Sequence, residues 1–371
     1  MKRILFLIVT FATAALGLGG CQDIGPVAQE PMPPAPNIVY NGTRAPWRNI
    51  LRQPADWYGS DDALALAVNV IRFQTNSGGW PKNLDMTRTP EQVDRTADPG
   101  ETLSTIDNDA TYTQIVFLAR VISARDEPYV HAAFNRGFDY LLAAQYPNGG
   151  WPQYFPLRPG YYTHITFNDN AMINALTVLR DASEGGAPYA FVDAARRAKA
   201  AAAVAKGIQC ILHSQIIING QPTVWCAQHN EKTLAPAPAR SYELVSLSGQ
   251  ESVEVTRFLM DIKNPSPSII AAVRGAVAWF KSAQLTGAQV QAMGGRAANA
   301  NAAMWGRFYD LATNKPFFSG RDGIKKWNLG EIEAERRNGY AWFGTWPTQL
   351  LSTDYPVWEQ RLAAAKTASA P

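Results

Sequence analysis

Apolar residues recur at helical spacing along most of the chain. Four runs carry apolar positions three and four residues apart, with much alanine and leucine, which predicts helices at 63–73, 132–144, 194–212 and 269–283. Second helices are predicted between and after them, at 109–125, 169–183, 250–261 and 335–351. The two-residue alternation that is typical of strands is almost absent. The pattern therefore predicts a mostly all-α protein, made of helical hairpins with long irregular loops.

The predicted hairpins repeat along the chain. Their first helices end in a glutamine followed by a turn, and these glutamines lie 71, 70 and 69 residues apart, at Gln74, Gln145, Gln215 and Gln284. Four such units predict a barrel or toroid whose loops form a cleft at one end. Two of the turns share the sequence GGWP, at 78–81 and 149–152, and we expect them to be structural. Lys82 and Gln153 follow these turns on the same rim and could contact a ligand.

The N-terminus carries the features of an export signal. Lys2 and Arg3 precede an apolar run at 4–16, which is too short to stay in a bilayer as a spanning helix. The sequence LGGC that follows resembles the bacterial lipobox, which implies cleavage of residues 1–20 and lipidation of Cys21. Gln22 resembles the residue found at this place in outer-membrane lipoproteins of Gram-negative bacteria. We therefore expect an outer-membrane lipoprotein, or a periplasmic or surface protein; a secreted protein with an incidental cysteine is the alternative.

The rest of the chain predicts a tether, one large domain and a tail. Residues 21–45 are rich in proline and poor in apolar side chains, which is typical of an extended linker. We expect the folded domain at 46–360 and a flexible tail at 361–371. The net charge of +3 gives no case for nucleic-acid binding, and nothing in the sequence predicts assembly, so we expect a monomer. Cys210 and Cys226 could form a disulfide or remain free, buried thiols.

Two clusters of Asp and Asn precede predicted helices. Asp107-Asn108-Asp109 stands before one helix and Asn168-Asp169-Asn170 before another. Asp and Asn are common N-caps, so capping is the simpler interpretation of either position alone. Three adjacent oxygen-bearing residues, found twice, exceed what a cap requires. The two clusters could share one Ca²⁺ ion, which prefers six to eight oxygen ligands.

Cationic residues gather in the irregular segments. The long segment at 225–249 interrupts the repeat and is expected to bring His229, Lys232 and Arg240 together. Arg307 and Arg321 follow near the C-terminus. For each of these two arginines alone a structural ion pair is the simpler role: Arg307 could pair with Asp310, and Arg321 could pair with Asp322 or with a neighbouring loop.

Oxygen ligands, arginines and aromatic rings in one cleft suit a carboxylated sugar polymer. Arginine pairs bidentately with carboxylates, and Ca²⁺ can bridge the carboxylates of protein and uronate. A glycoside hydrolase is the alternative, since Asp107 or Asp109 together with Glu251 could supply the two carboxyl groups that it needs. A surface glycan-binding lipoprotein without activity is a further alternative.

Five stretches in order resemble the pectate lyases of family ten of the polysaccharide lyases. They are TIDNDATYTQI, GGWPQYFP, YYTHITFNDNAMINAL, ARSYELVSLSGQES and the run at 305–347 that begins WGRFYDL. The resemblance covers roughly residues 45–355. It implies an (α/α)3 toroid, polygalacturonate as the substrate, and a Ca²⁺-dependent endo β-elimination that leaves 4,5-unsaturated products.

The resemblance also implies roles for individual residues. Arg240 matches the catalytic base, and Asp107 and Asp169 match the acidic metal positions, with Asp109 able to exchange with Asp107. Arg307 and Arg321 match arginines that bind the uronate, and Lys232, Asp109 and Asn168 are further candidates for substrate binding. Arginine is an unusual base because its pKa lies above about 12. The residues alone would favour Lys232 or His229, which titrate nearer to neutral pH.

Overall fold

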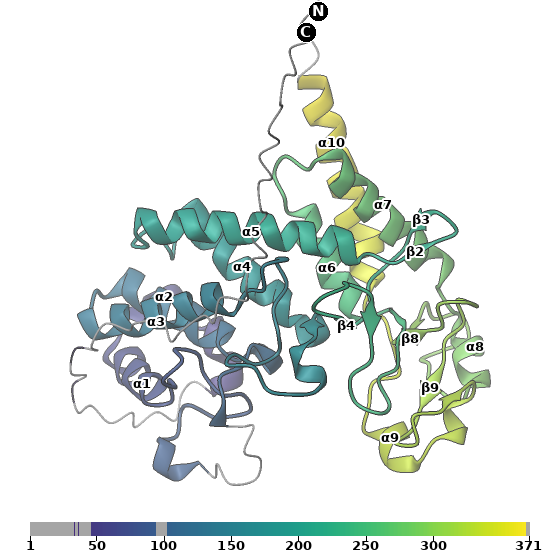
Figure 1. The fold of residues 1–371 in the computed structure, drawn as a ribbon, viewed down its shortest axis with the longest axis horizontal. Coiled ribbons are helices and arrows are strands. Elements are labelled where there is room, and N and C mark those ends of the chain that lie inside the picture. Colours follow the sequence, from purple (N-terminus) through teal and green to yellow (C-terminus); the bar gives the residue numbers. More distant parts are fainter. Residues whose placement is uncertain (1–32, 34–35, 37–45, 94–101, 369–371) are drawn as a thin grey trace, which may run out of the picture.

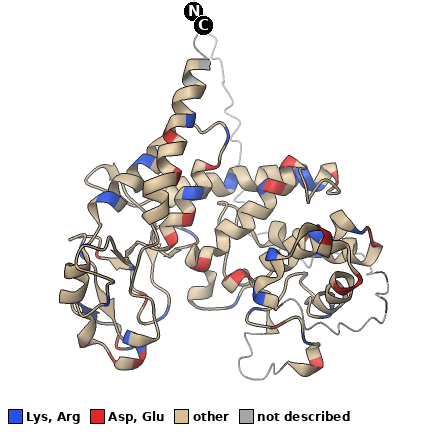
Figure 2. Ribbon diagram, turned by 180° about the vertical axis from the view of Figure 1, so that it is seen from behind, with Lys and Arg blue, Asp and Glu red and all other residues tan. Residues whose placement is uncertain are grey.

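The computed structural model describes residues 33, 36, 46–93 and 102–368. The expected signal, Cys21 and almost the whole of the expected tether lie outside the described residues. Figure 2 shows acidic and basic residues interspersed over the ribbon. Among the described helices, none combines the length and the apolar character that a membrane crossing needs.

The described chain is mainly helical, as Figure 1 shows. Its α-helices are α1 (Asp61–Arg72), α2 (Tyr112–Ala124), α3 (Pro128–Ala144), α4 (Ala171–Glu184), α5 (Ala194–Ser214), α6 (Glu251–Met260), α7 (Pro267–Ser282), α8 (Gly287–Ala292), α9 (Ala334–Asn338) and α10 (Tyr355–Ala368). Helices α2 and α3, α4 and α5, and α6 and α7 pack as successive pairs. Seven of the eight predicted helices are therefore confirmed.

The helix predicted at 335–351 is wrong. Helix α9 stops at Asn338, and Phe343–Gly344 (β11) pairs instead with Trp305–Gly306 (β7). Glycines and a proline in this segment favour turns over a continuous helix. The last long helix is α10, which follows a π-helical turn, η9 (Leu350–Asp354). It continues to Ala368, past residue 360 where we expected the domain to end, and the side chain of Arg361 donates to the carbonyl of Met260.

The repeated glutamines join consecutive hairpins. In each of three units the side-chain Nε2 donates to a carbonyl of its own turn and to a carbonyl of the next unit's first helix: Gln74 to Gly78 and Ala133, Gln145 to Gly149 and Ala203, and Gln215 to Thr223 and Ala272. These bonds explain why the glutamine recurs with the period of the repeat. Gln284 departs from the pattern, because it is exposed.

A buried tryptophan anchors each of the four turns. Its indole Nε1 donates to a carbonyl of the preceding helix at 2.7 to 2.8 Å: Trp80 to Val70, Trp151 to Leu141, Trp225 to Ile211 and Trp305 to Phe280. Glycine is required beside two of these tryptophans, since φ is +99° at Gly78 and +92° at Gly149. The structural role predicted for the GGWP turns is confirmed.

The described strands are two residues long and lie mainly in the C-terminal half. They are β1 (Ile165–Thr166), β2 (Ile217–Ile218), β3 (Gln221–Pro222), β4 (Gln228–His229), β5 (Pro236–Ala237), β6 (Leu247–Ser248), β7, β8 (Phe308–Tyr309), β9 (Phe318–Ser319), β10 (Lys325–Lys326) and β11. All pairs are antiparallel: β1 with β4, β4 with β5, β2 with β3, β6 with β8, β9 with β10 and β7 with β11. One large core fills the helical body, and a second core around Phe308, Phe318 and Trp342 forms a C-terminal lobe.

The two described cysteines are not bonded. Cys210 and Cys226 are both buried and free. Burial raises the pKa of the Cys210 thiol to about 12, so both stay protonated and unreactive at neutral pH. The sequence leaves open a disulfide or two free thiols, and in the structure the thiols are free.

Candidate active site

The two Asp/Asn clusters fold into matching turns that contact each other. They form the 3₁₀ turns η5 (Asp107–Asp109) before α2 and η7 (Asn168–Asn170) before α4. Each turn contains two left-handed residues, with φ of 51° and 59° at Asn108 and Asp109 and of 49° and 61° at Asp169 and Asn170. Asn and Asp adopt this conformation more readily than most side chains. The composition of the clusters therefore has a backbone cause as well.

Neither cluster caps its helix through a side chain. Helix α2 begins after Thr111 and α4 begins after Asn170, and neither of these side chains accepts a hydrogen bond from the first helical turn. The capping interpretation is therefore wrong. The carboxylate oxygens of the clusters are therefore not used for helix capping and can bind other groups.

Asp107 is nearly buried and binds one cation. Its side chain is 5% exposed, and Oδ2 accepts a hydrogen bond from Lys82 Nζ at 2.6 Å. Its other oxygen, Oδ1, is buried and has no hydrogen-bond partner. Burial lowers the pKa of Lys82, but the charge and hydrogen bond of Asp107, together with Tyr154, outweigh it; the pKa is raised and Lys82 is protonated. The rim residue Lys82 thus belongs to the acidic site, and Asp107 Oδ1 is an unused buried acceptor.

Arg307 connects the second cluster to another buried carboxylate. Its Nη2 donates to Glu251 Oε1, and lies 4.0 Å from Asp169 Oδ1 and 3.5 Å from Asn168 Oδ1. The Glu251 side chain is 1% exposed and also accepts a hydrogen bond from Ser248. Glu251 is therefore not accessible as the second carboxyl group of a glycosidase.

Asp169 lies between the two other acids. Burial raises the pKa of Asp169, and the charges of Asp107 and Glu251 raise it further, against the opposite effects of Arg307 and Asn168. Its side chain is 38% exposed, and Oδ2 accepts a hydrogen bond from Asn168 Nδ2 at 2.7 Å. Asp169 is the most exposed of the three carboxylates Asp107, Asp169 and Glu251.

Arg240 is held by a bidentate ion pair in the loop between β5 and β6. Its Nε and Nη2 donate to the two oxygens of Glu243 at 2.7 and 2.5 Å. Tyr340 also donates to Glu243 Oε1, at 2.9 Å, and the Arg307 guanidinium lies 4.5 Å from the Tyr340 ring centroid. One continuous network of contacts therefore leads from Arg240 through Glu243, Tyr340 and Arg307 to Asp169.

Glu243 keeps Arg240 protonated in the free protein. Burial lowers the pKa of Arg240, but the hydrogen bonds and charge of Glu243 outweigh it, so the pKa is raised. The Arg240 side chain is 44% exposed, while that of Glu243 is 5% exposed. Within the described residues, Nη1 of Arg240 has no hydrogen bond or ion pair.

The sequence analysis missed Arg336, a cation beside Arg240. Arg336 lies 4.7 Å and Arg240 lies 5.0 Å from the ring centroid of Tyr242. Arg321 lies farther out, with a side chain that is 62% exposed and pairs with Glu335 at 2.9 Å. The interpretation of 335–351 as a continuous helix hid this group.

The two C-terminal arginines do not pair with the aspartates nearest to them in the sequence. Asp310 binds Lys325, which lowers the pKa of that carboxyl to about 2, and Asp322 pairs with Lys326 at 3.4 Å. Arg307 pairs with Glu251 instead of Asp310, and Arg321 pairs with Glu335 of the neighbouring segment instead of Asp322.

The long segment does not bring its three cations together. His229 is fully buried in β4, where Nδ1 donates to the Leu234 carbonyl at 2.8 Å and Nε2 accepts from the Cys226 N–H at 3.1 Å. Burial lowers its pKa to about 4, so it is neutral. Lys232 lies in an exposed turn, and its side chain has no hydrogen bond or ion pair within the described part of the chain. Of the three, only Arg240 joins the network described above.

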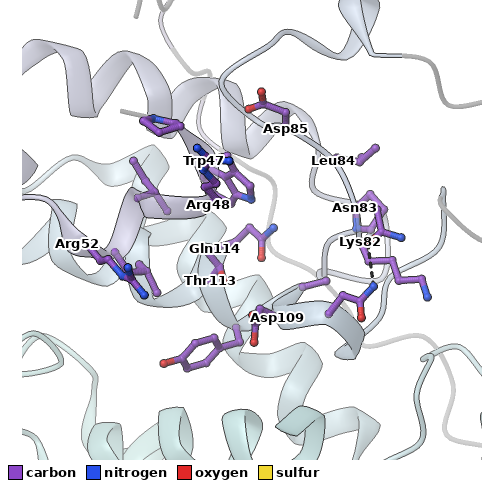
Figure 3. Close-up of a pocket in the computed structure, with 17 residues that line it drawn as sticks. Trp47, Arg48, Arg52, Lys82, Asn83, Leu84, Asp85, Asp109, Thr113 and Gln114 are labelled. Atoms are coloured by element: carbon purple, nitrogen blue, oxygen red, sulfur yellow. Dashed lines mark hydrogen bonds between the residues drawn. The ribbon is translucent and has the colours of Figure 1, made fainter. Parts of the chain in front are cut away.

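Within the described residues, Asp109 has no hydrogen bond or ion pair with this network. Its Oδ1 accepts a hydrogen bond from Asn174 at 2.9 Å, and burial raises its pKa. It lines a cavity of about 660 Å³ beside α2, shown in Figure 3. Asp107 rather than Asp109 acts electrostatically on Asp169, which places Asp107 as the partner of Asp169.

The donor chemistry of the acid pair fits a hard cation such as Ca²⁺. Asp107 and Asp169 offer carboxylate oxygens, of which Asp107 Oδ1 is buried and unpartnered. No three His, Cys, Asp or Glu side chains among the described residues form a complete metal site. Ca²⁺ takes six to eight oxygens, so a bound ion would need further ligands from amides, backbone, water or a carboxylated ligand.

Comparisons with known proteins agree on one family. A family model described as pectic acid lyase matches residues 74–351. A solved family 10 polysaccharide lyase from Cellvibrio cellulosa is 38% identical, with a TM-score of 0.71, over 84% of this chain and 94% of that chain. An aspartate-to-alanine mutant of that enzyme, in complex with trigalacturonic acid, is 38% identical, with a TM-score of 0.72, over 84% of this chain and 95% of that chain. No curated protein matches.

Proposed function

The chain belongs to the pectic acid lyase family, and from that membership we propose that it cleaves polygalacturonate by Ca²⁺-dependent endo β-elimination, leaving 4,5-unsaturated oligogalacturonides. It is a polysaccharide lyase, and its fold is the mostly helical α/α toroid that the sequence predicts. The trigalacturonic acid bound by a relative supports an oligogalacturonide ligand here. The observation that carries the proposal is the contact of the two acid clusters beside the network that leads from Arg307 to Arg240.

The chemistry explains why such a site needs both acids and arginines. Loss of the C5 proton of a galacturonosyl unit places negative charge next to a carboxylate that is already charged. A bound Ca²⁺ would neutralise that carboxylate and stabilise the developing charge. Asp107 and Asp169 are the residues that would hold the ion. Arg307, fixed by Glu251, would orient the uronate beside it, and Arg321 would contact the chain farther out.

Arg240 is the proposed base. It would take the C5 proton, the C–H electrons would form the C4–C5 double bond, and the C4 oxygen would leave with a proton from water. Because Glu243 binds Nε and Nη2, the nitrogen that can face the substrate is Nη1. The base must be neutral, while Glu243 favours the charged form, so cations brought close by the bound substrate complex must lower the pKa of Arg240. An alkaline activity optimum follows.

One assay tests the reaction. The purified protein is incubated with polygalacturonate, with Ca²⁺ or with a chelator, and the ultraviolet absorbance of the new double bond is followed. We expect an increase with Ca²⁺ that the chelator abolishes and that added Ca²⁺ restores. Reducing ends without absorbance would contradict elimination, and an unchanged rate with chelator would contradict the role of Ca²⁺. A rapid fall in viscosity at low conversion tests the endo mode.

We also propose that the protein is exported and lipidated on Cys21, as its lipobox-like sequence suggests. Mass spectrometry of the mature N-terminus tests this directly. A diacylglyceryl-modified cysteine as the first residue is expected, and it should be lost in Cys21→Ser. An unmodified N-terminus at another position would refute the anchor.

A further inference from the structure

A cavity of about 660 Å³ lies beside the acidic site and is lined by residues of the N-terminal third of the chain. Its walls come from the 3₁₀ helix η1 (Trp47–Arg52), the segment 81–85 and the start of α2. Figure 3 shows Trp47, Arg48 and Arg52 on one side of this η1 cavity and Lys82 and Asn83 on the other. Its volume lies within the range of about 300 to 1,000 Å³ that is typical of ligand pockets.

The η1 cavity adjoins the acidic site. Asn108 and Asp109, the neighbours of Asp107, line it, and so does Lys82, which binds Asp107. Lys82 therefore places the η1 cavity next to Asp107, one of the two acids that would hold the reacting uronate through the bound ion.

Two exposed arginines line the cavity. Arg48 and Arg52 are exposed, and within the described residues neither has a hydrogen bond or an ion pair. The other charges that line the cavity are already engaged. Lys82 pairs with Asp107, Asp85 accepts two hydrogen bonds from Thr87, and Asp109 accepts one from Asn174.

We propose that the η1 cavity is a distal subsite, in which Arg48 and Arg52 bind the carboxylate of a galacturonosyl unit that lies beyond the units being cleaved. This inference rests on the proposed function, which makes the substrate a polymer with a carboxylate on every unit. Arginine binds carboxylates through planar, charge-assisted hydrogen bonds. The rings of Trp47 and Tyr112 also line the cavity and offer apolar surface to a sugar face. Binding energy far from the reacting bond raises kcat/KM only for substrates long enough to reach it.

The test compares substrates of different length. The double variant Arg48→Gln, Arg52→Gln is assayed on trigalacturonate and on hexagalacturonate. The control variant Lys199→Gln, Lys206→Gln removes two exposed charges from α5, outside the cavity. We expect the double variant to lose about tenfold in kcat/KM on the hexamer, which corresponds to about 1.4 kcal/mol, and to keep its activity on the trimer within about twofold. The control variant should keep its activity on both substrates.

The other outcomes separate the two proposals. An equal loss on trimer and hexamer, or no loss on either, with an unchanged melting temperature, overturns the distal subsite and leaves the lyase assignment intact. If the wild-type protein forms no unsaturated product from any chain length, the proposed reaction fails. The subsite is then tested by calorimetric binding of hexagalacturonate, where unchanged affinity of the double variant overturns it and about tenfold weaker affinity supports it.

Discussion

Replacing Arg240 should remove turnover while leaving the fold nearly intact. The ion pair with Glu243 has two charge-assisted hydrogen bonds to a carboxylate that is 5% exposed. Breaking a fully buried pair costs about 3 to 5 kcal/mol, but the Arg240 side chain is 44% exposed, and water screens the pair accordingly. Tyr340 also remains bound to Glu243. We therefore expect Arg240→Ala to lower the free energy of unfolding by about 1 to 2 kcal/mol, a shift of a few degrees in melting temperature.

The kinetic effect should be much larger. A positioned general base contributes about a hundredfold to ten-thousandfold to the rate. In Arg240→Ala we expect kcat on polygalacturonate to fall by at least about a hundredfold, measured from double-bond absorbance at saturating substrate. Binding of trigalacturonate, measured by calorimetry, should weaken by less than about tenfold. Arg240→Lys should also be impaired, because an ammonium cannot reproduce the bidentate contact that orients the side chain.

A matched arginine provides the control. Arg274 on α7 binds Glu359 in the same bidentate geometry, with both distances at 2.9 Å, outside the site. Arg274→Ala should lose a similar or smaller amount of stability and no activity. Unsaturated product formed by Arg240→Ala at a nearly normal rate would refute the base assignment. A loss confined to substrate affinity would make Arg240 a binding residue instead.

Two further predictions concern buried charges. Glu251→Gln should lower the free energy of unfolding in urea by about 3 kcal/mol, because it leaves the buried Arg307 guanidinium with only its longer contact to Asp169 as an ion pair; an unchanged unfolding midpoint would contradict this. His229 has a folded pKa of about 4, below its ordinary value of 6.5. The unfolded chain therefore binds the extra proton between these two pH values, and the stability held above pH 6.5 is lost as pH falls towards 4. The loss is about 3 kcal/mol, and His229→Gln should flatten melting temperature against pH in this window.

The helical body follows directly from the sequence, because each helix has an apolar face with a regular period. The spacing of about 70 residues has a structural cause, because Gln74, Gln145 and Gln215 each donate a hydrogen bond to the first helix of the next hairpin. The same reasoning fails for the segment at 335–351, where Tyr340, Trp342 and Phe343 pack in the C-terminal lobe and not on one face of a helix. The conformation of this segment depends on a short antiparallel pairing of Phe343–Gly344 with Trp305–Gly306, which no local sequence pattern predicts.

The acidic half of the candidate site could be predicted, because its residues are distinctive in composition and occupy equivalent positions in the repeat. The Asp/Asn clusters stand out by composition, and their contact follows from their equivalent places in consecutive hairpins. The interpretation of Arg240 as the base depends on resemblance, because the residues alone favour Lys232 and His229. Its supporting partners, Glu243 and Tyr340, were missed. Tyr340 lies 97 residues along the chain from Glu243, and such a pairing leaves no periodic signal in a sequence.

The repeat also explains why Asp169 is the acid left accessible at the centre of the site. Asp107, Asp169 and Glu251 come from the starts of the second helices of three consecutive hairpins, α2, α4 and α6, so the toroid brings three carboxylates to one end. The two outer acids are each neutralised by a cation in direct contact, Asp107 by Lys82 and Glu251 by Arg307. Among the described residues, the nearest ion-pair partner of Asp169 is Arg307, at 4.0 Å. The three acids therefore differ: Asp169 has an open carboxylate and Asp107 has one buried, unpartnered oxygen, and these are the two oxygen donors that the proposed cation would use.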